Sequence, residues 1–122
     1  MNLASVEDRG GFAEFRYSGS LDLAEIARAS LSVLVHCQSE GLKGALIDLR
    51  ETEGTLDPLE RIDFARSIAP EWNRDILLAF VLHPSQHVPS RPGELAAQNR
   101  GMRTRTFLDH QMATAWLLAN VR

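Results

Sequence analysis

The sequence has few of the features that mark disulfide-bonded, secreted and membrane proteins. Its single cysteine, Cys37, excludes an intramolecular disulfide and is typical of a reducing compartment. The longest apolar run, 76-ILLAFVLH-83, is the length of a strand, whereas a membrane span needs roughly 20 residues. The N-terminal residues lack the basic and apolar regions of a signal peptide. We therefore expect a cytoplasmic protein without a membrane span.

The sequence also lacks a strong excess of positive or negative charge. Thirteen Lys and Arg residues stand against 16 Asp and Glu residues, so the net charge is −3. Domains that bind nucleic acid are usually basic, and we expect no nucleic-acid partner. A chain of 122 residues with 44% hydrophobic residues suits one globular domain, predicted to span residues 1–122.

The motifs of common active sites are absent as well. The sequence contains no phosphate-binding glycine loop, no dinucleotide-binding glycine motif and no serine nucleophile elbow. His83 and His87 are four residues apart, but Pro84 interrupts any helix that would align them on one metal ion. We expect two solvated histidines there, and we predict no catalytic residue, no metal and no cofactor.

What the sequence does contain is the alternation of strands and helices of an α/β fold. Residues 3–7 and 12–17 flank the turn sequence Asp8-Arg9-Gly10-Gly11 and predict an antiparallel hairpin. Later strands are predicted at 44–49, 76–83 and 102–107. Helices are predicted between Asp22 and Gly41, from Asp57 to about Ala69, from about Glu94 to Arg100, and from His110 to Val121. The order is ββαβαβαβα, which favours a mixed, mostly parallel sheet after the N-terminal hairpin.

Helix ends are the best-defined local signals. Asp57, Pro58 and Glu60 stand at the N-cap, N1 and N3 positions of the second helix and predict a capping box. Asp22 with Glu25 repeats this pattern at the first helix. Asp109 is the predicted cap of the last helix, whose buried face is predicted from the 3.6-residue period. That face comprises Met112, Ala113, Ala115, Trp116 and Ala119.

Together these elements resemble the SpoIIAA-like family of the STAS superfamily, the sulfate-transporter and anti-sigma-factor-antagonist domains. The resemblance lies in the element order and in three segments, 45-ALIDLR-50, 59-LERIDFA-65 and 99-NRGMRTRTFLDHQMATAWL-117. It implies a STAS-like fold and a non-enzymatic module that binds a partner protein, a nucleotide or an apolar ligand. A Rossmann-like or flavodoxin-like domain is the structural alternative.

One position departs from that family. The resemblance implies a phosphorylatable Ser at the start of the second helix, but the turn here is 50-RETEGTLDP-58, which holds only Thr52 and Thr55. A phosphate at either residue would face Glu51, Glu53 and Asp57, which disfavours it. We therefore expect the usual phosphorylation switch to be missing.

Four further residues are candidates for ligand or partner contacts. Asp48 lies inside an apolar run, so it either accepts hydrogen bonds that satisfy a buried carboxylate or lines a pocket at the carboxyl end of the strands. Arg100, Arg103 and Arg105 either bind an anionic group or shield an edge strand and pair with nearby carboxylates.

Three functions remain open at this point. The first is a regulatory or protein-interaction module. The second is a binder of a small apolar or amphipathic, lipid-like ligand in a pocket between sheet and helices. The third is an enzyme, for example a hydrolase built on Asp48, His83 and Glu60. The sequence leaves a homodimer open.

Overall fold

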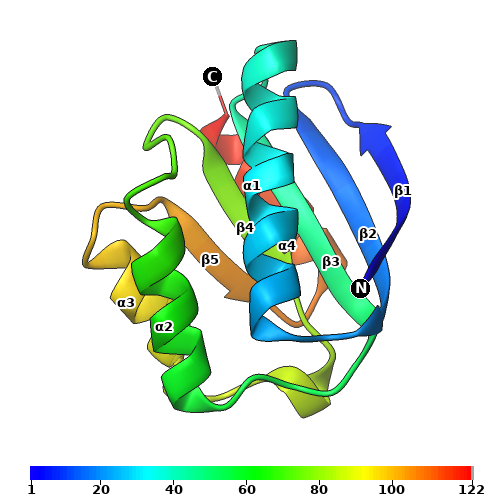
Figure 1. Cartoon of the computed structure of the whole chain (residues 1–122). Helices are drawn as coiled ribbons and strands as arrows, with labels where there is room; N and C mark the ends of the chain where they lie inside the picture. The colour runs from blue at the N-terminus through cyan, green and yellow to red at the C-terminus, as the bar shows by residue number, and fades with distance from the viewer. Residues whose placement is uncertain (122) are drawn as a thin grey trace.

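A five-stranded mixed sheet forms the centre of the computed structural model, which describes residues 1–121. The strands lie in the order in which they occur along the chain (Figure 1). β1 is antiparallel to β2, and every later neighbour pair is parallel, which confirms the predicted hairpin and the ββαβαβαβα order. The strands are β1 (Asn2–Asp8), β2 (Phe12–Ser20), β3 (Gly44–Glu53), β4 (Leu77–Val81) and β5 (Thr104–Phe107).

The helices cover the two faces of the sheet unequally. The strands from β2 to β5 are added in one direction, so crossovers of the same hand place their helices on the same face. These are α1 (Leu23–Glu40), α2 (Pro58–Ile68) and α3 (Pro92–Gln98), with a 3₁₀ turn, η1 (Pro84–Gln86), before α3. α4 (His110–Asn120) follows the last strand and covers the opposite face alone (Figure 1). In the described part of the chain, no helix has the length and apolar composition to cross a membrane.

Local capping explains where the helices begin. At α2 the predicted capping box is present, since Asp57 accepts from the backbone N–H of Glu60 at 2.8 Å and Glu60 accepts from that of Asp57 at 3.0 Å. At α1 only half of the predicted box forms. Asp22 accepts from the backbone N–H of Glu25 at 3.0 Å, but the Glu25 side chain binds the N-terminal ammonium group instead.

Each face of the sheet has its own apolar core. Side chains alternate along a strand, so β2 sends Phe15 and Tyr17 towards α1 and Phe12 towards α4. The core under α1, α2 and α3 is the larger one and includes Trp72, whose indole N–H donates to the carbonyl of Ile76 at 2.9 Å. The core under α4 is small, and polar side chains continue the sheet surface beyond it.

The predicted buried face of α4 was partly wrong. Ala113 is fully buried, and Trp116 is half-buried against Phe107. Met112, Ala115 and Ala119 are exposed, and Leu117 takes their place in the core. The cause is that α4 is apolar on several sides, so its helical period does not define one face, and packing against the sheet decides the outcome.

Candidate functional site

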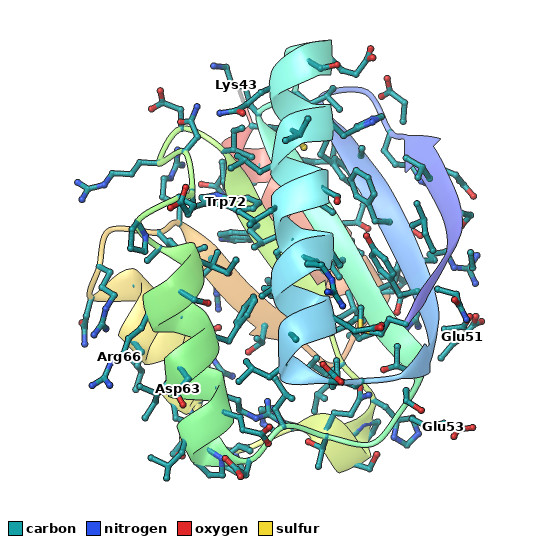
Figure 2. The ribbon with its side chains drawn as sticks, in the orientation of Figure 1. Lys43, Glu51, Glu53, Asp63, Arg66 and Trp72 are labelled. Atoms are coloured by element: carbon teal, nitrogen blue, oxygen red, sulfur yellow. The ribbon has the colours of Figure 1, made fainter. Side chains whose placement is uncertain are left out.

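The corner between β3 and α2 is shaped by a strand that runs further than the sequence predicts. β3 continues to Glu53 because Glu51, Thr52 and Glu53 pair with the end of β2. This extension buries Thr52, whose hydroxyl donates to the Leu49 carbonyl at 2.6 Å and accepts from Gln86 Nε2 at 2.8 Å. Thr52 therefore joins β3 to η1 in the interior, whereas Glu51 and Glu53 point outward (Figure 2).

Thr55 lies on the surface of the same corner. Its hydroxyl accepts from the Arg61 guanidinium at 2.8 Å. Arg61 also donates from Nε to the Leu56 carbonyl at 2.8 Å and from its terminal nitrogen to the Gln86 carbonyl. Burial lowers the pKa of this guanidinium. Arg61 thus ties the corner, the first turns of α2 and η1 into one rigid unit.

A small apolar cavity lies behind this unit, between the sheet and α1, α2 and α3. Its volume is about 90 Å³. Leu49 and Phe80 form its floor, Phe64 of α2 and Ala97 of α3 form its walls, and Arg61 lies at its edge. Asp48 is not among the lining residues, because its side chain points to the other face of β3. Asp48 therefore does not line the pocket at the carboxyl end of the strands that the sequence left open for it.

The structure separates Arg100 from Arg105, although the sequence places the three arginines together. Arg100 follows α3, where it donates to the Ala96 carbonyl at 2.9 Å and lines a surface hollow with Arg74 and Trp72. Arg105 projects from β5 on the α4 face, with its guanidinium 5.4 Å from the centre of the Phe107 ring. Arg103 is exposed just before β5. Arg100 therefore does not share a site with Arg105. Arg105 lies on the edge strand β5, as expected for a residue that shields a sheet edge.

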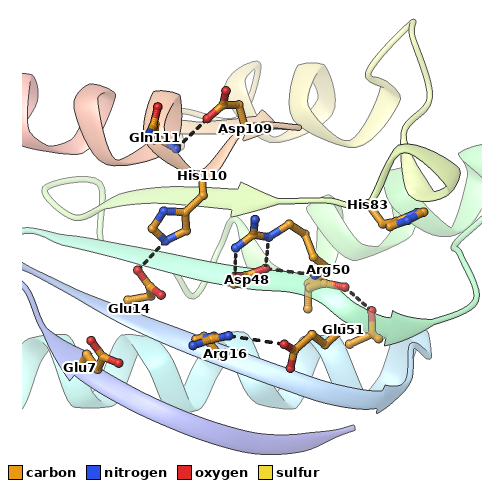
Figure 3. A network of polar contacts seen from close by, with 12 residues as sticks. Glu7, Glu14, Arg16, Asp48, Arg50, Glu51, His83, Asp109, His110 and Gln111 are labelled. Carbon is orange, nitrogen blue, oxygen red and sulfur yellow. Dashed lines mark hydrogen bonds and ion pairs between the residues drawn. The ribbon is translucent and has the colours of Figure 1, made fainter.

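Polar side chains gather on the α4 face of β2 and β3, next to the N-terminus of α4 (Figure 3). Glu14 of β2 and Asp48 of β3 each have a side chain only 4% exposed. His110, the first residue of α4, lies above them, with its Nε2 2.7 Å from Glu14 Oε1. One ligand atom from each of these three residues lies within 4.8 Å of the other two. We call Glu14, Asp48 and His110 the carboxylate–histidine cluster.

The negative charge of the buried Asp48 is balanced mainly by Arg50, two residues along the same strand. Arg50 donates from Nε to Oδ1 at 3.0 Å and from its terminal nitrogen to Oδ2 at 2.7 Å, and its backbone N–H donates to Oδ1 at 3.1 Å. Burial by itself raises the pKa of Asp48, but the hydrogen bonds and charge of Arg50 outweigh it, so the pKa lies below its usual value. The carboxylate is ionised at neutral pH.

Arg16 makes a similar contact in a very different environment. It bonds Glu51 at 3.4 Å, and both side chains are largely exposed. Arg9 lies 2.8 Å from Glu7 and 3.6 Å from Glu14. Two ion pairs, Arg16–Glu51 and Arg9–Glu7, therefore accompany the buried Glu14 and Asp48, and Figure 3 shows the first of them.

The residues suggested for a hydrolase do not come together. Asp48 points to the α4 face, whereas Glu60 caps α2 on the other face of the sheet. The His83 ring bonds the Ser85 hydroxyl at 2.9 Å and lies well apart from Asp48 in Figure 3. Within residues 1–121, no hydrogen bond joins any two of these three residues.

Glu14, Arg50 and His110 were missed as site residues in the sequence. A signal for Glu14 existed, since Phe12, Glu14 and Arg16 share one strand face and place a carboxylate beside a core residue. The partner of Glu14 could not be inferred, because His110 is 96 residues away along the chain.

The comparisons with known proteins bear on the fold. No protein-family model matches the sequence, and no curated protein matches it. A solved structure described as an anti-sigma factor antagonist from Mycobacterium paratuberculosis superposes with a TM-score of 0.60, at 16% sequence identity. The match covers 93% of this chain and 92% of that one. The chain therefore shares the fold of that protein. The STAS-like architecture suggested by the sequence is thereby confirmed, with almost the whole chain included.

Proposed function

We propose that this protein is a non-enzymatic regulatory module that acts by binding a partner protein through the corner between β3 and α2. The observation that carries the proposal is the shared fold with an anti-sigma factor antagonist, over nearly the full length of both chains. Two further observations support it. The sequence lacks common catalytic motifs, and the residues considered for hydrolysis are spread over both faces of the sheet.

The corner has the chemistry of a docking surface. Leu59, in the first turn of α2, is 73% exposed, the largest exposure among the large hydrophobic residues described. The capping box and the Arg61 contacts hold it on a rigid support, so little side-chain or loop ordering is needed on binding. Asp57 caps the same helix, and Asp63, one helical turn after Leu59, adds negative charge on the outer side of α2 (Figure 2). The fitting partner has an apolar pocket with a basic rim, and its affinity falls as salt rises.

We further propose that this contact operates without a phosphorylation switch. The corner has no Ser, and Thr52 is buried with both a donor and an acceptor satisfied. Thr55 is exposed, but Glu53 and Asp57 flank it and its hydroxyl is held by Arg61. Thr55→Ala is accordingly expected to bind the partner as well as wild type does.

Affinity capture from an extract of the source cells tests the proposal. Wild type is expected to retain a specific protein that Leu59→Gln loses by about tenfold or more, because burying a leucine of this size contributes about 1.5 to 3 kcal/mol. Leu118→Gln is the matched control, since Leu118 is an exposed leucine on α4 at the other face of the sheet. Equal capture by both variants would place the interface elsewhere. Repeated capture with no specific protein would remove the partner hypothesis.

A second candidate function has one specific observation in its favour. The cavity under α1, α2 and α3 is lined mainly by apolar side chains, with Arg61, Arg91 and Glu94 among its polar residues, which suits the tip of a small amphipathic ligand. At about 90 Å³ it holds only a few carbon atoms, whereas typical ligand pockets are about 300 Å³ or larger. A lipid-like ligand therefore requires α2 and α3 to move apart.

Native mass spectrometry of the purified protein tests this candidate. A bound fatty acid or phospholipid should appear as a defined added mass and should raise the melting temperature. Val88→Phe, which fills the cavity from a loop, should abolish both effects, and Val35→Phe on the exposed side of α1 should not. The absence of added mass and of any thermal shift with fatty acids would exclude ligand binding.

A further inference from the structure

The carboxylate–histidine cluster lies on the α4 face of the sheet and has no part in the partner binding proposed for the β3–α2 corner. Glu14, Asp48 and His110 come from β2, β3 and α4, and their ligand atoms converge within 4.8 Å. Acidic groups are common on protein surfaces, but here the Glu14 and Asp48 side chains are both only 4% exposed. Placing two carboxylates side by side in the interior is costly unless cations compensate them.

The compensation of the two carboxylates is unequal. Asp48 is matched by the two-pronged contact with Arg50. Glu14 has His110 on Oε1 and Arg9 at 3.6 Å from the same oxygen. Among the described residues, no donor forms a hydrogen bond to its second oxygen, Oε2. The buried carboxylate nearest to the imidazole therefore keeps an oxygen without a protein partner.

We propose that Glu14, Asp48 and His110 bind a divalent transition-metal ion of the Zn²⁺ class. Carboxylate oxygen together with imidazole nitrogen suits Zn²⁺ and its neighbours in the first transition row, whereas Ca²⁺ and Mg²⁺ prefer oxygen alone. Ligand atoms bound at about 2.0 to 2.2 Å in a tetrahedron lie about 3.3 to 3.6 Å apart, so on binding the most distant pair of ligand atoms, within 4.8 Å now, closes by no more than roughly 1.5 Å. Glu14 Oε1 and His110 Nε2, now 2.7 Å apart, exchange their hydrogen bond for the ion and move apart by about 0.6 to 0.9 Å. Rotation of side chains supplies such a change.

The neighbouring groups fit this role. Asp48 Oδ1 accepts two hydrogen bonds from Arg50, but Oδ2 accepts only one and keeps a second lone pair, with which Asp48 can bind the ion without losing its contacts with Arg50. Arg50 then orients the carboxylate, as outer hydrogen bonds do around metal ligands. His110 is 29% exposed at its side chain, which gives the ion a path from solvent. An ion held in this way joins the first turn of α4 to the central strands.

A calorimetric titration with ZnCl₂ at pH 7.5 tests the proposal. The protein is first treated with a chelator, which is then removed. Wild type is expected to bind one Zn²⁺ per chain with a dissociation constant on the order of micromolar or tighter, and to show a higher melting temperature with Zn²⁺. MgCl₂ at the same concentration should change neither quantity. His110→Ala is expected to weaken binding by at least about a hundredfold, since it removes a direct ligand.

Two controls separate this site from binding by surface histidines. His83→Ala and His87→Ala should bind Zn²⁺ as wild type does, because both residues lie in the segment around η1, away from the cluster. In an NMR titration of wild type, Mn²⁺ should broaden the signals of His110 and its α4 neighbours before those of His83. This experiment does not depend on the folding of any variant. Undiminished binding in His110→Ala, loss of binding in His83→Ala, or broadening at His83 first would overturn the proposal. None of these results depends on whether a partner protein binds the corner.

Discussion

Replacing Arg50 with Met tests whether Arg50 is what allows Asp48 to be buried as an anion. The change removes the charge and two hydrogen bonds but keeps an apolar stem of similar length. A hydrogen bond to a charged group contributes about 1.5 to 3 kcal/mol, and partial exposure of Arg50 reduces this, so we expect a loss of about 1 to 2 kcal/mol at pH 7. The melting temperature should then fall by about 3 to 10 °C.

The pH dependence gives the sharper test. In wild type the pKa of Asp48 is lowered on folding, so its contribution is present above the unfolded value of about 3.9 and is lost as the pH falls through the folded pKa. Without Arg50, burial raises that pKa, so Asp48 costs stability at neutral pH and protonation relieves the cost. The difference in unfolding free energy between wild type and Arg50→Met should therefore be smaller at pH 3 than at pH 7.

Urea unfolding at both pH values, followed by circular dichroism, measures this difference. Arg16→Met is a matched control, because Arg16 and Arg50 have the same side-chain exposure of 41%, but the partner of Arg16 is the exposed Glu51. Its effect should stay below about 1 kcal/mol at either pH. If Arg50→Met is equally destabilising at pH 3 and pH 7, the loss comes from packing of the stem and the electrostatic explanation is wrong.

Three other predictions follow from buried contacts. Thr52→Val removes the 2.8 Å acceptor of the Gln86 amide, which keeps only longer contacts with two carbonyls, and should lower the free energy of unfolding in urea by about 1 to 2 kcal/mol. Thr55→Val at the surface should change it by less than about 0.5 kcal/mol, and equal effects of the two variants would contradict the difference in their roles. Gly44→Ala would place a Cβ 2.7 Å from Val121 Cγ1 and should lower stability by about 1 to 3 kcal/mol, so an unchanged melting temperature would show that the C-terminal end of α4 yields freely. Burial raises the pKa of the Cys37 thiol to about 11, so at pH 8 the native protein should react with a disulfide reagent more than about a hundredfold slower than the urea-unfolded chain, and comparable rates would indicate local opening of α1.

Local chemistry made most of the fold predictable from the sequence. The cap residues Asp22, Asp57 and Asp109 each begin a helix, and the turn after Asp8 joins an antiparallel hairpin. The same approach failed at α4, where several sides of the helix are apolar and only contact with the sheet selects Leu117 for the core. Patterns within a short segment cannot supply that information.

The candidate site shows the same division. Asp48 stood out because a carboxylate interrupts an apolar run, and its hydrogen-bond requirement proved to be met by Arg50 within the same strand. Arg100 and Arg105 are close together in sequence but point to different parts of the surface, since one follows α3 and the other lies on β5. The approach of His110 to Glu14 depends on α4 folding back under the sheet, and nothing in either local sequence specifies it.

Hydrogen–deuterium exchange on the protein with its captured partner would test the central claim most directly. If the protein is a partner-binding module of the kind proposed, backbone amides of residues 51–61 should exchange more slowly in the complex, and those of α4 should be unchanged. Protection confined to α4 or β1, with residues 51–61 exchanging as in the free protein, would contradict the assignment of the β3–α2 corner as the binding surface.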